Sequence, residues 1–137
     1  MLGARALTAL RWLYGAFFVA MGLMVASSVL FGIGGPPPQP NAEAQAFVDA
    51  LTRARFIDPL LAGCYLAGGL ATLWLRTAPL GLALLSPAVA IIAAYHVTLS
   101  GLWPVAIVLA AIHAALLWHF RARLACLWRE PRITDSA

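Results

Sequence analysis

The spacing of the charged residues constrains this chain more than any other feature of the sequence. Three stretches of 31, 17 and 44 residues carry no charge, and they lie between Arg11 and Glu43, between Asp58 and Arg76, and between Arg76 and Arg121. A helix needs about 20 apolar residues to cross a hydrocarbon core of ~30 Å. The first two stretches therefore fit one membrane span each, and the third fits two spans joined by a turn.

The composition supports a location in the membrane. Of the 137 residues, 63% are apolar and 10% are charged, whereas a soluble domain has about half apolar and about a quarter charged residues. We therefore expect residues 1–137 to form a single transmembrane domain with an all-α fold, an integral membrane four-helix bundle. The predicted spans are residues 7–32, 58–76, 79–99 and 103–121.

The arginines indicate the topology. Cytoplasmic loops carry the excess of basic residues, so the side with more arginines is predicted to be inside, with both termini (N-in/C-in). The membrane is predicted to be a bacterial cytoplasmic (inner) membrane. This asymmetry accounts for the basic pI of about 9.8 without a role in nucleic-acid binding. The inner set is Arg5, Arg11, Arg76, Arg121, Arg123, Arg129 and Arg132, and the outer set is Arg53 and Arg55.

The first outer loop contains a proline-rich segment and then a short amphipathic helix. Residues 36–40 read PPPQP, and proline cannot donate a helix hydrogen bond, so the first span ends before them. Asn41 is a favourable N-cap for a helix over residues 42–56. We expect this helix to lie in the interface plane or to cap the outer mouth of the bundle. Its apolar face contains Phe47, Val48, Leu51 and Ala54.

Local signals also mark the second and third spans. Asp58 predicts an N-cap, and Pro59 predicts the first helical position of the second span. This span is expected to end at Arg76, whose long side chain can reach the interface. The following turn is short, so the third span should return antiparallel beside the second. Pro87 predicts a bend near the middle of the third span.

Small residues recur at every fourth position of the spans. Such rows let neighbouring backbones approach closely, so we expect them to specify a compact bundle or a contact between copies of the chain. In the second span the two adjacent rows are Gly63, Ala67 and Ala71, and Cys64, Gly68 and Thr72.

The spans lack the groups that several membrane activities require. No Asp or Glu lies within them, which argues against proton-coupled or cation-coupled transport. The chain has no CxxC pair for a disulfide relay. His96 and His113 are predicted to differ by roughly 10 Å in depth, which disfavours shared ligation of a haem. We therefore predict no catalytic residue, no metal site and no covalently bound cofactor, and we expect no catalytic activity from the chain alone.

Polar side chains within the spans are the candidate ligand-binding residues. His113 follows Ala106 by seven positions and so shares its helix face. Two roles fit this histidine, an interhelical hydrogen bond or a contact with a quinone or lipid headgroup. The candidate partners for the hydrogen bond are Ser86, Tyr65, Thr72 and a carbonyl freed by Pro87. The candidate ligand-binding set is His96, His113, Tyr65 and Ser86.

The order of several short segments resembles the DoxX-like (DoxX/DoxD) family. The matching segments are residues 11–15 (RWLYG), the proline-rich outer loop, and residues 46–51 (AFVDAL), 66–70 (LAGGL) and 95–97 (YHV). The resemblance implies a four-helix membrane protein, linked in some relatives to a thiosulfate:quinone oxidoreductase or to the anchoring of thiol-metabolism enzymes. Many relatives carry a Glu shortly before the paired glycines, where this chain has Cys64 and Tyr65. His96 matches the family's late histidine in the third helix.

Three interpretations of function follow. The leading one is an accessory or quinone-proximal subunit of a membrane oxidoreductase system, with a membrane or peripheral oxidoreductase as its partner. The alternative is an oligomeric protein that binds or conducts a lipid or a small apolar molecule, because the uncharged spans disfavour ions. The third is a purely structural subunit of a membrane assembly.

Overall fold

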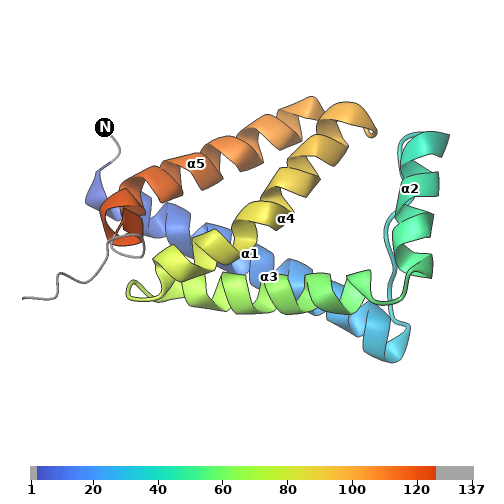
Figure 1. Cartoon of the computed structure of the whole chain (residues 1–137), viewed down its shortest axis with the longest axis horizontal. Coiled ribbons are helices and arrows are strands. Elements are labelled where there is room, and N and C mark those ends of the chain that lie inside the picture. Colours follow the sequence, from blue (N-terminus) through green and yellow to red (C-terminus); the bar gives the residue numbers. More distant parts are fainter. Residues whose placement is uncertain (1–2, 126–137) are drawn as a thin grey trace, which may run out of the picture.

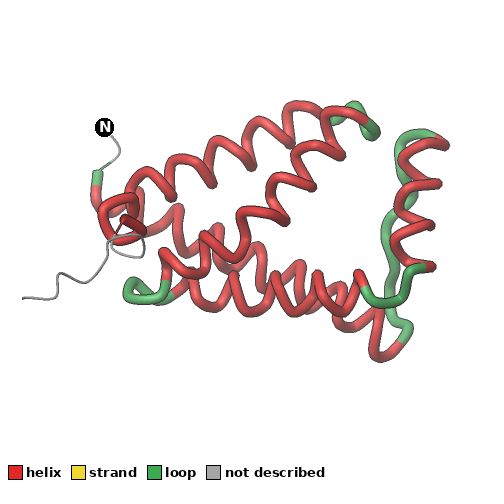
Figure 2. The backbone as a smooth tube through the Cα atoms, viewed as in Figure 1, coloured by secondary structure: helices red, strands yellow, loops and turns green. Residues whose placement is uncertain are grey.

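The computed structural model describes residues 3–125, and this part of the chain contains five helices and no strand (Figures 1 and 2). The predicted all-α fold is therefore confirmed for these residues. Arg129 and Arg132 lie outside the described residues. The helices are α1 (Ala4–Phe31), α2 (Ala42–Arg53), α3 (Ile57–Leu73), α4 (Ala78–Thr98) and α5 (Trp103–Ala125).

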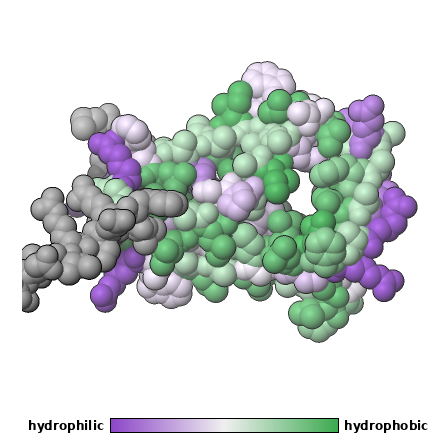
Figure 3. Space-filling view, in the orientation of Figure 1, coloured by the Kyte–Doolittle hydropathy of each residue, from purple (hydrophilic) through white to green (hydrophobic). Residues whose placement is uncertain are grey.

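Among the described residues, three helices are long and apolar enough to cross a membrane: α4, α5, and the part of α1 from Arg5 to Phe31. A fourth candidate is the pair formed by α2 and α3, which is bent by 91°. Large apolar side chains cover the outside of the molecule, with Leu13 at 70% exposure and Leu60 at 69%. Hydrophilic residues gather at the two ends of the molecule in Figure 3, with hydrophobic residues between them. This distribution is that of a helical protein in contact with lipid.

The long helices pack in the order α1, α3, α4, α5. Contacts are extensive between α1 and α3, between α3 and α4, and between α4 and α5, but sparse between α1 and α5. Pro87 lies inside α4, and the ribbon of α4 changes direction near its middle (Figure 1), as the sequence predicts. The fully buried side chains at the centre include Phe18, Leu82, Leu85 and Leu116.

Paired glycines let α3 approach both of its neighbours. A Cβ atom on Gly69 would lie 2.8 Å from the backbone nitrogen of Val19 in α1, and one on Gly68 would lie 2.6 Å from Leu85 in α4. Gly81 in α4 faces α3 in the same way, because its Cβ would lie 2.6 Å from the carbonyl oxygen of Gly68. The backbones of α1, α3 and α4 therefore meet without intervening side chains.

The two small-residue rows predicted in the second span differ in the structure. The row of Cys64, Gly68 and Thr72 faces α4, as expected, since Gly68 and Thr72 are buried and Cys64 Sγ donates to the carbonyl oxygen of Leu84 at 3.4 Å. The other row does not pack within the chain at Gly63, where a Cβ atom would meet nothing within 4 Å, so a contact between copies of the chain stays a prediction for this row. Helix α1 approaches α3 at Gly69, on a different part of its surface.

The start of α3 also differs from the prediction. Its N-cap is Phe56, without a side-chain cap, so Asp58 lies inside the first turn and Pro59 follows it. Arg55 has a positive φ of 56° at the 91° bend between α2 and α3, and Leu60 N already donates to the carbonyl oxygen of Phe56 at 3.3 Å. The helix therefore begins before the capping residue that the sequence suggested.

The ends of four predicted segments are shifted as well. The predicted second span ends at Leu73 as α3, so Arg76 lies in the turn that follows. The first and fourth spans are longer than predicted, since α1 begins at Ala4 and α5 continues to Ala125. The interfacial helix α2 is shorter and ends at Arg53.

Helix α2 and its N-cap contact the C-terminal end of α4. The Asn41 side chain accepts a hydrogen bond from Ala44 N at 2.8 Å, which confirms the predicted N-cap, and it donates to the carbonyl oxygen of Leu99 at 2.7 Å. The ring of Phe47 stacks on Tyr95 with centroids 5.7 Å apart. The ribbon of α2 accordingly crosses one end of the molecule (Figure 1).

Candidate functional site

Three helices contribute to a polar chain inside the bundle. The Tyr14 hydroxyl of α1 lies 2.5 Å from His113 Nδ1 of α5, and Ser86 Oγ of α4 lies 3.0 Å from His113 Nε2. Tyr14 and His113 are 4% and 6% exposed, so their polar atoms depend on one another for hydrogen bonds. The chain therefore links α1, α5 and α4 through one imidazole.

The serine determines the direction of these hydrogen bonds. Ser86 Oγ also contacts the carbonyl oxygen of Leu82 at 2.9 Å, and a carbonyl can only accept. Because a hydroxyl has a single proton, Ser86 donates to Leu82 and accepts from His113 Nε2. Burying an unpaired charge is costly, so the buried imidazole carries a single proton; its Nδ1 atom is then unprotonated and accepts the proton of the Tyr14 hydroxyl. In this arrangement the imidazole is neutral and each proton of the chain has an acceptor.

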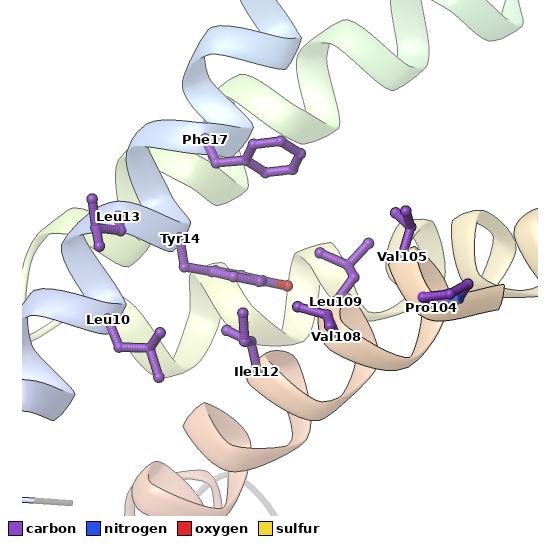
Figure 4. Close-up of a pocket in the computed structure, with 9 residues that line it drawn as sticks. All are labelled: Leu10, Leu13, Tyr14, Phe17, Pro104, Val105, Val108, Leu109 and Ile112. Atoms are coloured by element: carbon purple, nitrogen blue, oxygen red, sulfur yellow. The ribbon is translucent and has the colours of Figure 1, made fainter. Parts of the chain in front are cut away.

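A cleft of about 540 Å³ lies between α1 and α5, where these two helices barely touch. Tyr14 carries the one polar side chain among the residues that line it, and Figure 4 shows its hydroxyl oxygen directed toward α5. Leu13 and Val108 are exposed, so the cleft opens at the apolar surface of the molecule. The lining residues are Leu10, Leu13, Tyr14, Phe17, Pro104, Val105, Val108, Leu109 and Ile112.

The volume and the lining of this cleft are those of a small-molecule site. Ligand pockets usually measure ~300–1,000 Å³ and combine apolar walls with a few placed polar groups. Here the Tyr14 hydroxyl is such a group, and the hydrogen bond to His113 fixes its position. The cleft can therefore hold an apolar molecule and contact one polar atom of it.

The structure brings two of the four candidate residues together, because Ser86 and His113 share a hydrogen bond. Tyr65 lies apart from them and packs its ring on Phe18, with centroids 5.4 Å apart. Thr72, a further candidate partner, donates to the carbonyl oxygen of Gly68 at 2.7 Å instead.

His96 belongs to a different part of the molecule. Its Nδ1 atom lies 2.8 Å from Ser100 Oγ, in the turn between α4 and α5. The neighbouring Tyr95 hydroxyl donates to Gln39 Oε1 at 2.5 Å. His96 thus lies near the C-terminal end of α4, close to the loop that precedes α2, and takes no part in the chain around His113.

Tyr14 is the residue of this site that the sequence analysis did not select. Its helix position supplies a signal, because Arg11, Tyr14 and Phe18 follow one another at intervals of three and four residues and so share one face of α1. All three are buried. When a tyrosine and an arginine share one face of a membrane span, that face is expected to point into the helix bundle and not toward the lipid.

Arg11 has a second role besides its contribution to the charge asymmetry. Its guanidinium group donates to the carbonyl oxygen of Thr72 at 2.7 Å and also to that of Leu73. Arg123 of α5 donates to the carbonyl oxygen of Leu75 at 2.9 Å. Cations near a helix C-terminus are stabilising, so Arg11 satisfies two carbonyls in the last turn of α3, and Arg123 satisfies one in the turn that follows.

Within residues 3–125, the structure contains no group of three or more His, Cys, Asp or Glu side chains that could hold a metal ion. No protein-family model matches the chain, and neither a curated protein nor a solved structure matches it. The candidate spans and the apolar exterior define the class of this chain as an α-helical membrane protein.

Proposed function

We propose that this chain is a DoxX-like integral membrane protein that binds a membrane quinone in the α1–α5 cleft and acts as a quinone-proximal accessory subunit of a membrane oxidoreductase. The observation that carries the proposal is the apolar cleft with the Tyr14 hydroxyl as its polar contact. A quinone consists of a ring with oxygen substituents and an apolar tail. The ring oxygen fits the hydroxyl, and the tail fits the apolar walls.

The proposed topology has four spans with both termini in the cytoplasm of a bacterium. In it, α3 alone crosses the membrane as the second span, and α2 lies along the outer surface. Two features support this topology. Helices α2 and α3 meet at 91°, and Arg11 and Arg123 contact the last turn of α3 and the turn that follows it, respectively. In this topology the contacts made by these two arginines lie on the cytoplasmic side.

Quinone binding can be measured directly on the purified chain. A decyl-substituted hydroquinone should bind the wild-type protein in micelles under nitrogen, and Tyr14→Phe should weaken this binding about fivefold, the effect of losing one hydrogen bond. Tyr95→Phe is the matched control, because Tyr95 lies at the outer end of α4 and bonds to Gln39. Absence of binding to the wild type would refute the proposal.

The accessory role requires a second experiment. Mass spectrometry of proteins that copurify from native membranes should identify an oxidoreductase in near-stoichiometric amount. Recovery of the chain alone would remove the subunit assignment while leaving quinone binding intact.

A second candidate function is the binding or permeation of a lipid or another apolar molecule by an oligomer of this chain. The observation in its favour is that the cleft opens at the apolar surface, where Leu13, Val105 and Val108 are exposed. Flux of an apolar dye through liposomes that contain the purified protein would support this function. An accessory subunit should show no such flux.

A further inference from the structure

We propose that the cleft prefers the hydroquinone form of its ligand over the quinone form, and that Ser86 sets this preference through His113. The inference rests on the proposed function, because it concerns the same cleft. It follows from the hydrogen bond that Ser86 donates to Leu82.

The hydrogen-bond chain has two possible directions. In the first, Tyr14 donates to Nδ1, Nε2 donates to Ser86, and Ser86 donates to the carbonyl oxygen of Leu82, so three hydrogen bonds form. In the second, Ser86 donates to Nε2 and Nδ1 donates to the oxygen of Tyr14. The second direction loses the bond to Leu82 and leaves the proton of Tyr14 facing the apolar cleft. An unpaired buried donor is unfavourable, so the empty cleft keeps the first direction.

The ligand contacts Tyr14 differently in the two directions. In the first direction the Tyr14 oxygen has donated its own proton and can only accept, which suits a ligand hydroxyl. In the second direction the Tyr14 proton points into the cleft, which suits a ligand carbonyl. A hydroxyl ligand keeps all three bonds and adds one, whereas a carbonyl ligand requires reversal and loses the Ser86–Leu82 bond. The hydroquinone therefore gains one hydrogen bond relative to the quinone.

Ser86 acts as a positioning residue in this scheme, since it contacts His113 and not the cleft. Replacing it by alanine removes the partner of Nε2 and the bond to Leu82 together. Both directions then have equal numbers of hydrogen bonds, so the two ligand forms should bind equally. Threonine at this position retains a hydroxyl that can bond the carbonyl four residues earlier.

The test compares three probes on the purified full chain in micelles under nitrogen, by titration calorimetry. The probes are a decyl-substituted benzoquinone, the corresponding hydroquinone and dodecanol. We expect the wild type to bind the hydroquinone about fivefold more tightly than the quinone, as one net hydrogen bond allows. The ratio should fall to about one in Ser86→Ala and return in Ser86→Thr. The matched control is Ser27→Ala, because Ser27 also donates to a carbonyl of its own helix, that of Met24 at 2.8 Å.

Each outcome has a defined meaning. Equal affinities in the wild type, or an unchanged ratio in Ser86→Ala, would overturn the inference while quinone binding stands. Binding of neither ring compound would overturn the proposed function and the inference together. Dodecanol binding as tight as that of the hydroquinone would assign the hydroxyl preference to lipids and overturn the quinone assignment. Circular dichroism verifies that each variant folds, and Ser86→Thr provides the readout if Ser86→Ala does not.

Discussion

The two sides of α1 illustrate two kinds of helix contact. On the side toward α3, glycines bring the backbones together, and Gly69 lies so close to Val19 that a Cβ atom would meet its backbone nitrogen at 2.8 Å. On the side toward α5, the contacts are sparse and a cleft of about 540 Å³ remains. Lipid does not favour helix association by the hydrophobic effect, so close packing supplies the stability. The side of α1 toward α5 lacks this close packing and therefore leaves room for a ligand.

The glycine contact between α3 and α4 should give the largest effect on stability. A Cβ atom on Gly81 would lie 2.5 Å from Thr72 Oγ1 and 2.6 Å from the carbonyl oxygen of Gly68. We expect Gly81→Ala to lower the free energy of unfolding by about 3 kcal/mol, because two backbones must separate. Gly63→Ala is the control. It faces open space and should stabilise the helix by up to about 1 kcal/mol. Titration with a denaturing detergent, followed by circular dichroism, measures both, and equal effects would contradict the role assigned to Gly81.

The buried arginine should give the next largest effect. Arg11 is 6% exposed and donates to the carbonyl oxygens of Thr72 and Leu73. We expect Arg11→Met to cost about 2 kcal/mol, since charged hydrogen bonds are among the stronger ones and their loss leaves buried carbonyls unpaired. Arg5→Met, at an exposed position on the same helix, should change stability by less than about 0.5 kcal/mol. The same unfolding assay separates the two, and a neutral Arg11→Met would refute the capping role.

The hydrogen-bond chain around His113 should contribute less to the stability than Arg11 does. We expect Tyr14→Phe to destabilise by about 1 kcal/mol, because it leaves His113 Nδ1 without its partner. Tyr14→Phe and Ser86→Ala should also be non-additive, since both act through the same imidazole. A double-mutant cycle measures this coupling. Additive effects would show that the two bonds are independent.

A substitution at the open side of the cleft should have the smallest effect on stability and a large effect on ligand binding. Val108 lines the cleft and is 58% exposed, whereas Ile107 is 56% exposed and lies outside the lining. We expect Val108→Trp to change the stability by less than about 0.5 kcal/mol. It should weaken quinone binding at least about tenfold, a difference of about 1.4 kcal/mol, because the indole fills the cleft. Ile107→Trp should leave the affinity unchanged. Equal affinities in the two variants would place the ligand elsewhere.

Much of the secondary structure could be predicted from the sequence, because it depends on local signals. Charge-free stretches marked the long helices, and Asn41 marked the start of α2. The start of α3 was predicted less well. The chain bends by 91° between α2 and α3, and α2 contacts residues near the C-terminal end of α4. A single segment of sequence does not contain the information about such contacts.

The site could be predicted only in part for a related reason. The pairing of His113 with Ser86 was among the alternatives, since both lie in the central parts of their helices. Tyr14 was missed because its partner lies 99 positions away in the sequence. The order of the helices decides which tyrosine reaches the imidazole, and this order follows from glycine contacts whose partners the sequence does not name. Tyr65, equally polar and equally buried, meets Phe18 instead.

The unequal lengths of the two paired helices have a consequence for the surrounding lipid. Helix α1 has 28 residues and α3 has 17, which correspond to about 42 Å and about 26 Å of helix. With α3 as a span, its hydrophobic length falls short of a ~30 Å bilayer core, while that of its neighbour exceeds it. Such mismatch is relieved by local thinning of the bilayer at the short helix and by tilting of the long one. We therefore expect the protein to favour thinner membranes and short-chain lipids.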